Sequence, residues 1–543
     1  ILTATTQVHL EWNYGTGDDH TPNALLGYQV RIGTASEAHD VVSGRVTGYP
    51  GNAGATTSFH VTLSTGTYYW SAAAIDNTGY ATSTWAVEDR FTIAFATFST
   101  IWTDGDAENT AAVEWGDYDG DGDIDLLLAN YSATPSRLYN NNGDDTFTDV
   151  WMLGSDDRRD CAWGDYDGDG DIDIVFGSDS NVSLYRNDGA ASFGLAWQSA
   201  LQDVSGIAFG DIDGDGDLDV VAGNVAGTNN RIYTYDGSDQ FSIYWTAPAD
   251  KSTASSELAD YDGDGDLDVL FGNGSNQQNQ VFRNDGAGVF TNDWSTPEFD
   301  DTAEALWGDY NSDGLPDILS GNQPSTPQNR VYTNNGDGTF SLVWTSPEPD
   351  DRTYSVSWGD FDADGDLDFV AGNWSNTGTR LWSNQGGTGD FKAEWFKAEG
   401  PTMGIEWGDY DGDGDLDIYA GKASGSLHRN NMIPAAGLSN SSPSAPGISP
   451  EPDLNFVGST STVLLEWSAP ADDHTPAGLL GYLLRVGTQS AGNSVVSGAF
   501  AGYPGNAGPT TTFYLSLSSG TYFWSVAAID TTGFSTSSWS AED

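Results

Sequence analysis

Closely spaced aspartates recur along the chain, and they are its most direct indication of chemistry. The stretch WGDYDGDGDIDLLLAN begins at Trp115 and places five aspartates at alternate positions from Asp117 to Asp125. Carboxylates at this spacing repel one another by roughly 2–3 kcal/mol per pair at about 6 Å, with an effective dielectric near 20. We therefore expect a cation to lie among them.

The stretch occurs seven times. Its first aspartate falls at positions 117, 165, 211, 260, 309, 360 and 409, so successive copies lie 48, 46, 49, 49, 51 and 49 residues apart. Each copy follows the pattern D-x-D-x-D-G-x-x-D, with Asn311 in place of the second aspartate in the fifth copy. One such segment could be a solvated acidic turn, whereas seven at a regular spacing favour a cation site.

The ligand types in this pattern suit calcium. Side-chain oxygens at positions 1, 3, 5 and 9 and the backbone carbonyl of position 7, around a glycine at position 6, match the oxygen coordination of Ca²⁺. An EF-hand continues to a glutamate at position 12 on a helix, whereas here an apolar β run such as DLLLA follows position 9. The loop therefore joins two strands, and we predict about seven calcium sites, the fifth being the weakest.

The candidate metal residues, copy by copy, are Asp117, Asp119, Asp121, Asp123 and Asp125; Asp165, Asp167, Asp169, Asp171 and Asp173; Asp211, Asp213, Asp215, Asp217 and Asp219; Asp260, Asp262, Asp264, Asp266 and Asp268; Asp309, Asn311, Asp313, Leu315 and Asp317; Asp360, Asp362, Asp364, Asp366 and Asp368; Asp409, Asp411, Asp413, Asp415 and Asp417.

The elements around each loop follow a common plan. A strand precedes the loop and a second follows it. A third strand then leads through an Asn-Gly or Asp-Gly hairpin into a fourth strand of the form F-x-x-x-W, as at Phe147 to Trp151. Four strands repeated seven times with this period are typical of a β-propeller. The seventh repeat lacks a fourth strand, and FSTIW at Phe98 to Trp102 has the same form, so we predict that this N-terminal strand closes the ring.

These repeats resemble the FG-GAP or VCBS repeats of integrin α-subunit propellers and of many secreted bacterial proteins, over roughly residues 94–432. The resemblance implies that the calcium loops lie on a lower face, and that the loops between strands 2 and 3 and between strands 4 and 1 form an upper, ligand-facing surface. Integrin propellers carry the calcium loop in only some blades. Its presence in all seven here suggests a structural role for calcium in every blade.

The two ends of the chain resemble each other and flank the propeller. VHLEWNYGTGDDHTP from Val8 pairs with VLLEWSAPADDHTP from Val463, and both ends carry a late T-Y-[YF]-W strand. This pattern resembles fibronectin type III β-sandwiches. We predict sandwiches at 1–92 and 454–543, a propeller at 93–432 and a Ser/Pro-rich linker at 433–453. The duplication suggests one period of a longer sandwich–propeller array.

Composition narrows the class of partner. The 80 acidic residues against 18 Lys and Arg give a net charge of −62, which disfavours nucleic acids and anionic membrane surfaces as partners. Cys161 is the single cysteine, which rules out an internal disulfide and thiolate-rich metal sites. No apolar run reaches the ~20 residues of a membrane span, and no signal-peptide pattern begins the sequence.

Signs of catalysis are weak. No Ser-His-Asp arrangement, H-E-x-x-H helix or phosphate-binding glycine loop stands out. The paired DDHTP segments favour capped turns over a metal or acid/base site, and the number of carboxylates leaves a glycosidase pair open. We expect no enzyme activity. Trp374, Phe299, Arg158 and Arg159 are candidate ligand contacts, while the repeated Trp residues favour packing between blades.

We therefore expect a non-catalytic, secreted or surface-anchored, calcium-stabilised propeller in a repeat array that acts in adhesion, matrix or filament assembly. Loops of this type in extracellular modules bind calcium at about 10⁻⁴–10⁻³ M, which favours a location outside the cell. Its partner would be a protein or glycan on the upper face, or another copy of the array. One alternative is a carbohydrate-binding propeller similar to integrin-like fungal lectins, and another is an accessory region of a larger secreted enzyme.

Overall fold

The computed structural model describes the propeller region and isolated strands on either side of it. Described are residues 98–430 except 106–108, 133, 155, 190, 226, 287, 324–327, 348–351, 363–365, 375–377, 399, 413–415 and 423, together with the flanking strands named below. Within these residues every regular element is a β-strand, and no helix is long and apolar enough to cross a membrane.

The propeller consists of seven four-stranded antiparallel sheets. The first four blades contain β7 (Thr110–Gly116), β8 (Asp125–Asn130), β9 (Ser136–Asn141) and β10 (Phe147–Leu153); β11 (Arg158–Gly164), β12 (Asp173–Ser178), β13 (Val182–Asn187) and β14 (Phe193–Gln198); β15 (Val204–Gly210), β16 (Asp219–Asn224), β17 (Arg231–Tyr235) and β18 (Phe241–Thr246); β19 (Thr253–Ala259), β20 (Asp268–Asn273), β21 (Gln280–Asn284) and β22 (Phe290–Ser295).

The last three blades contain β23 (Thr302–Gly308), β24 (Asp317–Asn322), β25 (Arg330–Asn334) and β26 (Phe340–Thr345); β27 (Arg352–Gly359), β28 (Asp368–Trp374), β29 (Thr379–Asn384) and β30 (Phe391–Lys397); β31 (Gly404–Gly408), β32 (Asp417–Gly421), β33 (Ser426–Arg429) and β6 (Ser99–Thr103). Strand β6 pairs antiparallel with β33. The prediction that the N-terminal strand completes the seventh blade is confirmed.

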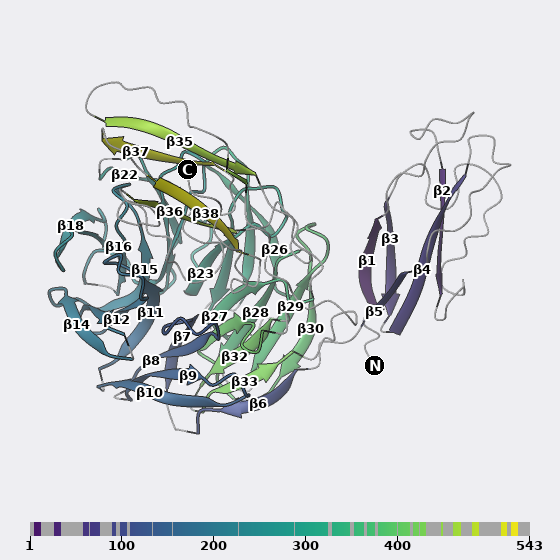
Figure 1. Cartoon of the computed structure of the whole chain (residues 1–543), viewed down its shortest axis with the longest axis horizontal. Helices are drawn as coiled ribbons and strands as arrows, with labels where there is room; N and C mark the ends of the chain where they lie inside the picture. Colours follow the sequence, from purple (N-terminus) through teal and green to yellow (C-terminus); the bar gives the residue numbers. More distant parts are fainter. Residues whose placement is uncertain are drawn as a thin grey trace. The chain divides into compact units, whose positions relative to one another are not determined.

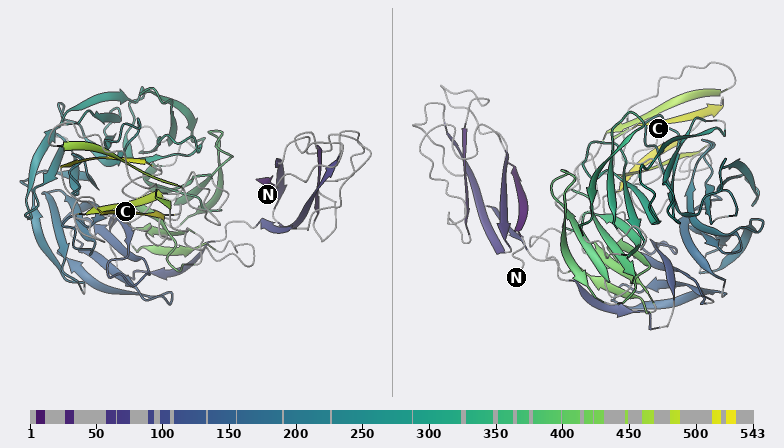
Figure 2. Two further views of the ribbon diagram at one scale, coloured as in Figure 1. Left: turned by 45° about the horizontal axis from the view of Figure 1, so that its top comes forward. Right: turned by 180° about the vertical axis from the view of Figure 1, so that it is seen from behind.

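The blades form a closed ring with their first strands innermost (Figures 1 and 2). Each first strand contacts the first strand of the next blade, and β31 of the last blade contacts β7 of the first. The second strands carry the core, because every residue of β8, β12, β16 and β20 is buried. Strands buried on both faces read as continuous apolar runs, which explains why DLLLA and DIVFG lack alternation.

The repeated Trp-Gly pair at the end of the first strand is an inter-blade contact. A Cβ atom on Gly308 would lie 2.6 Å from Nε1 of Trp358 in the next blade, and one on Gly408 would lie 2.7 Å from Nε1 of Trp115. Glycine is therefore required because the tryptophan of the following blade packs directly on the backbone. This contact confirms that the repeated Trp residues pack between blades.

The F-x-x-x-W strands form the outer edge of each blade and contain an irregularity. In β10 the pairing with β9 shifts register between Asp149 and Trp151, and β14, β18, β22, β26 and β30 shift at the equivalent place. The bulge places the tryptophan against the phenylalanine of the next blade. Trp151 and Phe193, for example, have ring centroids 5.0 Å apart.

The flanking segments contribute separate strand pairings. On the N-terminal side β1 (Thr5–Glu11) pairs with β3 (Ser58–Ser64), and β2 (Gly27–Gly33), β4 (Gly66–Ile75) and β5 (Asp89–Ile93) form a second sheet. On the C-terminal side the sheets are β34 (Gly447–Ile448), β35 (Thr460–Ser468) and β37 (Thr512–Ser518), and β36 (Gly481–Gly487) with β38 (Phe523–Ile529). The fibronectin-like sandwiches remain a prediction, and most of the predicted linker and both DDHTP segments lie outside the described residues.

Candidate metal centres

Each candidate calcium loop joins the first and second strands of its blade, as predicted. In the first blade the loop runs from the end of β7 to Asp125, where β8 begins. The fold brings positions 1, 3 and 9 together, with one ligand atom of each residue within 4.8 Å of the others, in at least five loops: Asp117, Asp119 and Asp125; Asp165, Asp167 and Asp173; Asp211, Asp213 and Asp219; Asp260, Asp262 and Asp268; Asp360, Asp362 and Asp368.

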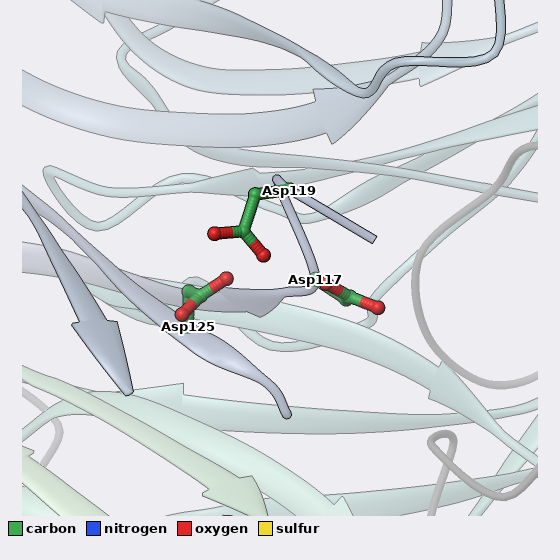
Figure 3. A group of neighbouring side chains, drawn as sticks. All are labelled: Asp117, Asp119 and Asp125. Carbon is green, nitrogen blue, oxygen red and sulfur yellow. The ribbon is translucent and has the colours of Figure 1, made fainter. Parts of the chain in front are cut away.

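Figure 3 shows the first of these groups, in which the carboxylates of Asp119 and Asp125 face each other with Asp117 beside them. The three residues converge although position 9 belongs to a strand and the other two to the turn. Three carboxylates in one small volume are a hard-oxygen donor set.

The position-1 carboxylate organises the turn. Asp165 accepts backbone N–H bonds from Gly168 and Asp169 on Oδ1, at 2.8 and 3.1 Å, and from Gly170 on Oδ2 at 3.0 Å. The glycines at positions 4 and 6 have positive φ, +73° for Gly168 and +99° for Gly170, a region that glycine adopts readily. The glycines thus let the backbone wrap around the first carboxylate.

The position-9 carboxylate is buried and anchors the loop to the sheet. Asp268 accepts the N–H of Tyr261, at position 2 of the loop, on Oδ2 at 3.2 Å, and the N–H of Asn284, at the end of the third strand, on Oδ1 at 2.7 Å. Because each carboxylate oxygen can accept more than one bond, these contacts leave capacity for a cation.

Burial has a marked effect on these carboxyl groups. Burial first, and then repulsion from neighbouring loop aspartates, raise the pKa of Asp125, Asp173 and Asp317 to about 8 and that of Asp268 to about 9. Raised carboxyl pKa values mean that protons compete with a cation for the loop. Cation binding is therefore expected to weaken as the pH falls through this range.

Positions 5 and 7 have different roles. Position 5 accepts the N–H of position 7, as from Asp123 to Oδ1 of Asp121 at 3.0 Å. The position-7 side chain turns toward the hairpin glycine of its own blade, because a Cβ atom on Gly143 would lie 2.7 Å from Oδ2 of Asp123. This direction agrees with a backbone, rather than side-chain, ligand at position 7.

The fifth copy keeps the turn despite its altered sequence. Asp309 accepts N–H bonds from Asp313 at 3.1 Å and from Gly314 at 2.8 Å. Asn311 and Leu315 reduce the number of carboxylates without changing these bonds. The predicted weakness of this site therefore concerns its charge. In the sixth and seventh copies Asp364, Asp413 and Asp415 lie outside the described residues.

A further observation shows that the loop carboxylates suit a divalent cation. Oδ1 of Asp167, at position 3 of the second loop, is buried and has no hydrogen-bond partner. A buried carboxylate oxygen without a partner is costly unless a cation or water satisfies it. Asp165, Asp167 and Asp173, together with the position-7 carbonyl, would hold calcium here.

A second set of carboxylates, which the sequence analysis missed, converges on the axis of the ring. Its members are half-buried and lie three or five residues before the first loop aspartate on innermost strands: Glu114, Asp160, Glu257, Glu304 and Glu406. Burial raises the pKa of each, and mutual repulsion raises most of them further. The signal was their shared parity on the strand that precedes each loop.

The four predicted ligand contacts differ in exposure. The ring of Phe299 is 62% exposed, and Trp374 at the end of β28 packs against Tyr354 with ring centroids 5.3 Å apart. Arg159 pairs with Asp203. The prediction for Arg158 is wrong: its side chain is 2% exposed and donates to the carbonyl of Gly154 at 2.6 Å. Arg158 therefore supports the fold.

Comparison with protein families found one match. The model described as FG-GAP-like repeat matches residues 117–176, 165–222, 211–271, 260–320, 309–371 and 360–420. These overlapping matches extend from the first loop to the seventh blade and together span more than half of the chain. A comparison with curated protein sequences found no match.

Solved structures that are partly similar to this chain include the following two. The structure of BBS1N in complex with ARL6DN is 12% identical, with a TM-score of 0.48 over 64% of this chain and 100% of that one. A lectin from Agrocybe aegerita, described as recognising non-reducing terminal N-acetylglucosamine, is 20% identical, with a TM-score of 0.35 over 65% of this chain and 93% of that one.

Proposed function

Because the chain belongs to the family of FG-GAP-like repeat proteins, we propose that its propeller is a non-catalytic, calcium-binding module of an extracellular protein. The observation that carries this proposal is the recurrence of one carboxylate triad, at loop positions 1, 3 and 9, in at least five described loops. A single acidic turn would have little weight, but the same triad repeated between equivalent strands points to one ligand.

Calcium would supply positive charge at the junction of the first and second strands. The position-9 aspartate is part of the second strand, whereas positions 1 and 3 belong to the turn, so a shared cation would hold the turn against the sheet. At tenfold excess over its dissociation constant each ion adds about 1.4 kcal/mol, and seven add about 10 kcal/mol. This sum is comparable to the whole stability of a typical domain.

The location outside the cell follows from the affinity expected of such loops. With dissociation constants of about 10⁻⁴–10⁻³ M, the sites would fill only where free calcium is high. We propose a secreted or surface protein in which the propeller, with its fibronectin-like flanks, is one period of an array that acts in adhesion, matrix or filament assembly.

Carbohydrate binding is the second candidate, and one observation favours it. Trp374 and Tyr354 place two rings side by side at the loop end of the sixth blade, with a centroid distance of 5.3 Å, and aromatic faces of this kind pack against apolar faces of ligands. Glycan binding that Trp374→Ala abolishes would favour this candidate over self-association. Binding of neither glycans nor further copies of the chain would count against both.

The calcium proposal is tested by the number of bound ions. Equilibrium dialysis of the purified chain against millimolar calcium should give six or seven ions per chain, and about one fewer in Asp262→Asn, which removes one position-3 ligand. Asp285→Asn, in the hairpin of the same blade, is the matched control and should leave the number unchanged. Fewer than two ions bound to the wild-type chain would contradict the proposal.

A further inference from the structure

One residue, which ends the third strand or, in the seventh blade, directly follows it, lies between the metal loops of adjacent blades. It is an asparagine in six blades and a tyrosine in the third: Asn141, Asn187, Tyr235, Asn284, Asn334, Asn384 and Asn430. All six asparagines are buried, with exposed fractions of 0–2%. A buried amide needs a partner for each of its polar atoms, so the partners of these side chains show what they hold together.

Within its own blade the asparagine joins the metal loop to the hairpin. The backbone N–H of Asn334 donates to Oδ1 of Asp317, the position-9 aspartate, at 2.7 Å. Its Nδ2 donates to the carbonyl of Pro316 at 3.2 Å, and its Oδ1 accepts the N–H of Gly336 at 2.9 Å. The backbone contact persists in the third blade, where Tyr235 donates to Asp219 at 3.0 Å.

The same side chain also reaches the metal loop of the preceding blade. Nδ2 of Asn334 donates to the carbonyl of Tyr261, at position 2 of the fourth loop, at 2.9 Å. The equivalent bonds, 2.7–3.1 Å long, join Asn141 to Tyr410, Asn187 to Tyr118, Asn284 to Ile212, Asn384 to Tyr310 and Asn430 to Phe361. One amide therefore contacts two loops that belong to adjacent blades.

Position 2 lies between two ligand positions of its loop. Tyr261 follows the position-1 ligand Asp260 and precedes the position-3 ligand Asp262, and its N–H donates to the position-9 ligand Asp268. A cation that fixes these three carboxylates also fixes the peptide between them. The carbonyl of Tyr261 is then already ordered for Asn334, which in turn orders Asp317.

From this geometry we propose that the asparagine couples neighbouring calcium loops, so that an ion bound in one blade raises the affinity of the next. The inference rests on the proposed calcium function and adds its regulation. Coupling between sites is reciprocal, and it needs no large movement when one ligand orders groups that the next must also order. The asparagine is a positioning residue, since it contacts the ligands and not the ion.

One interface lacks this link. In the third blade Tyr235 takes the place of the asparagine, and its ring packs edge-on against Tyr166, the position-2 residue of the second loop, with centroids 5.2 Å apart. Because tyrosine has no side-chain amide, Tyr235 cannot make the bond that asparagine makes to the position-2 carbonyl in the other blades. Asparagine links therefore join the third loop to the fourth, and so on in order to the seventh, which is linked to the first, which is linked to the second. The second and third loops are the neighbouring pair without such a link.

A double-mutant cycle tests the coupling. Asp262→Asn removes a ligand from the fourth loop, and Asn334→Leu removes the amide between the fourth and fifth loops. Calcium titration calorimetry should show that each single change weakens binding at a neighbouring loop, by about fivefold or more, and that the two effects do not add. The control is Asn335→Leu, at the adjacent asparagine, whose amide contacts Thr339 and Ser341 of its own hairpin. Its effect on calcium affinity should simply add to that of Asp262→Asn.

Additive effects of Asp262→Asn and Asn334→Leu would overturn the coupling, and unfolding in EDTA would report structural damage separately. If Asn334→Leu does not fold, the second loop, which adjoins the open interface, and the fourth loop, which does not, give a second test. Asp167→Asn affects a loop linked on one side, and Asp262→Asn one linked on both, so at half-saturating calcium the second should lose more ions. Equal losses would overturn the coupling, whereas a wild-type chain that binds no calcium would refute the proposed function itself.

Discussion

The aspartates of each loop destabilise the fold without a cation and stabilise it with one. In the first loop Asp117, Asp119 and Asp125 present ligand atoms within 4.8 Å of one another, and burial raises the pKa of Asp125 to about 8. Without a cation these charges repel, and the chain must protonate some of them or keep the loop open. With a cation the same charges stabilise the fold.

The effect of Asp119→Asn on the stability of the fold should therefore differ between calcium and EDTA. The variant removes one ligand, so in saturating calcium it should bind one ion fewer and lose about 1–2 kcal/mol of stability. In EDTA it removes a repulsive charge and should be at least as stable as the wild type. Chemical denaturation in both conditions measures the difference, with Asp144→Asn in the hairpin of the same blade as the control. Equal destabilisation in EDTA and calcium would contradict the assignment of Asp119 as a ligand.

The carboxylates on the ring axis predict a pH dependence that calcium does not remove. Burial raises the pKa of Glu304 from 4.5 to about 7, and the charges that face it are those of Glu114, Asp160, Glu257 and Glu406. The folded chain binds more protons than the unfolded chain between these two pH values. Stability from this group is thus complete below about pH 4.5 and is lost as the pH rises through 7.

Glu304→Gln should weaken that dependence. Glutamine keeps an oxygen for the N–H of Val356, which donates to Glu304 at 2.6 Å, and it cannot ionise. In saturating calcium the variant should lose less stability between pH 5 and pH 8 than the wild type, with a difference of roughly 1–3 kcal/mol at pH 8. Denaturant titrations at both pH values measure this difference. An equal loss of stability between pH 5 and pH 8 in the two proteins would contradict the prediction.

At the scale of elements, the contacts between blades depend on glycine at the end of the first strand. The nearest atoms to a Cβ on Gly308 are Nε1 and Cδ1 of Trp358, at 2.6 and 2.7 Å. These distances are shorter than van der Waals contact, and the indole is held between blades, so the side chain has no free space into which to move.

Gly308→Ala should consequently destabilise the propeller by about 1–3 kcal/mol, independently of calcium. Gly154→Ala is a matched control, because a Cβ atom on Gly154 would meet nothing within 4 Å. Thermal unfolding of the two variants in calcium and in EDTA makes the comparison. A Gly308→Ala variant as stable as Gly154→Ala would show that the blades can separate enough to accept the methyl group.

Periodicity was sufficient to predict the elements, while contacts between distant residues were not predictable. The loop spacing and the F-x-x-x-W strands predicted four strands per blade, and the strands beginning at Phe147 and Phe193 start where expected. The bulge before Trp151 has no local sequence signal, because it arises from packing on the next blade. Arg158 was misjudged for the same reason, because the ring of Phe176 beneath it lies on the neighbouring strand.

At the scale of the whole molecule, the ring closes through a strand that is distant in sequence from its partners. Strand β6 pairs with β33, and Ser99 is registered with Arg429. The closure was predictable because FSTIW repeats a form that the seventh repeat lacks. The asparagine links between loops were not, since their acceptor carbonyls lie about 70 residues away along the chain in most blades.

Closure makes the stability of each blade depend on its neighbours. Each first strand contacts those of two neighbours, so a loop that opens in one blade weakens the contacts on both sides. A ring whose loops all require cations should then unfold as one unit, and its melting temperature should report the filling of the loops together.

Thermal unfolding of the chain in EDTA and across a calcium titration is the most direct measurement of the central claim. A rise in melting temperature of well over 10 °C as calcium reaches the millimolar range, with six or seven ions bound by calorimetry, is the predicted result. An unchanged melting temperature would show that the loops are not a calcium framework and would contradict both the proposed function and its extracellular setting.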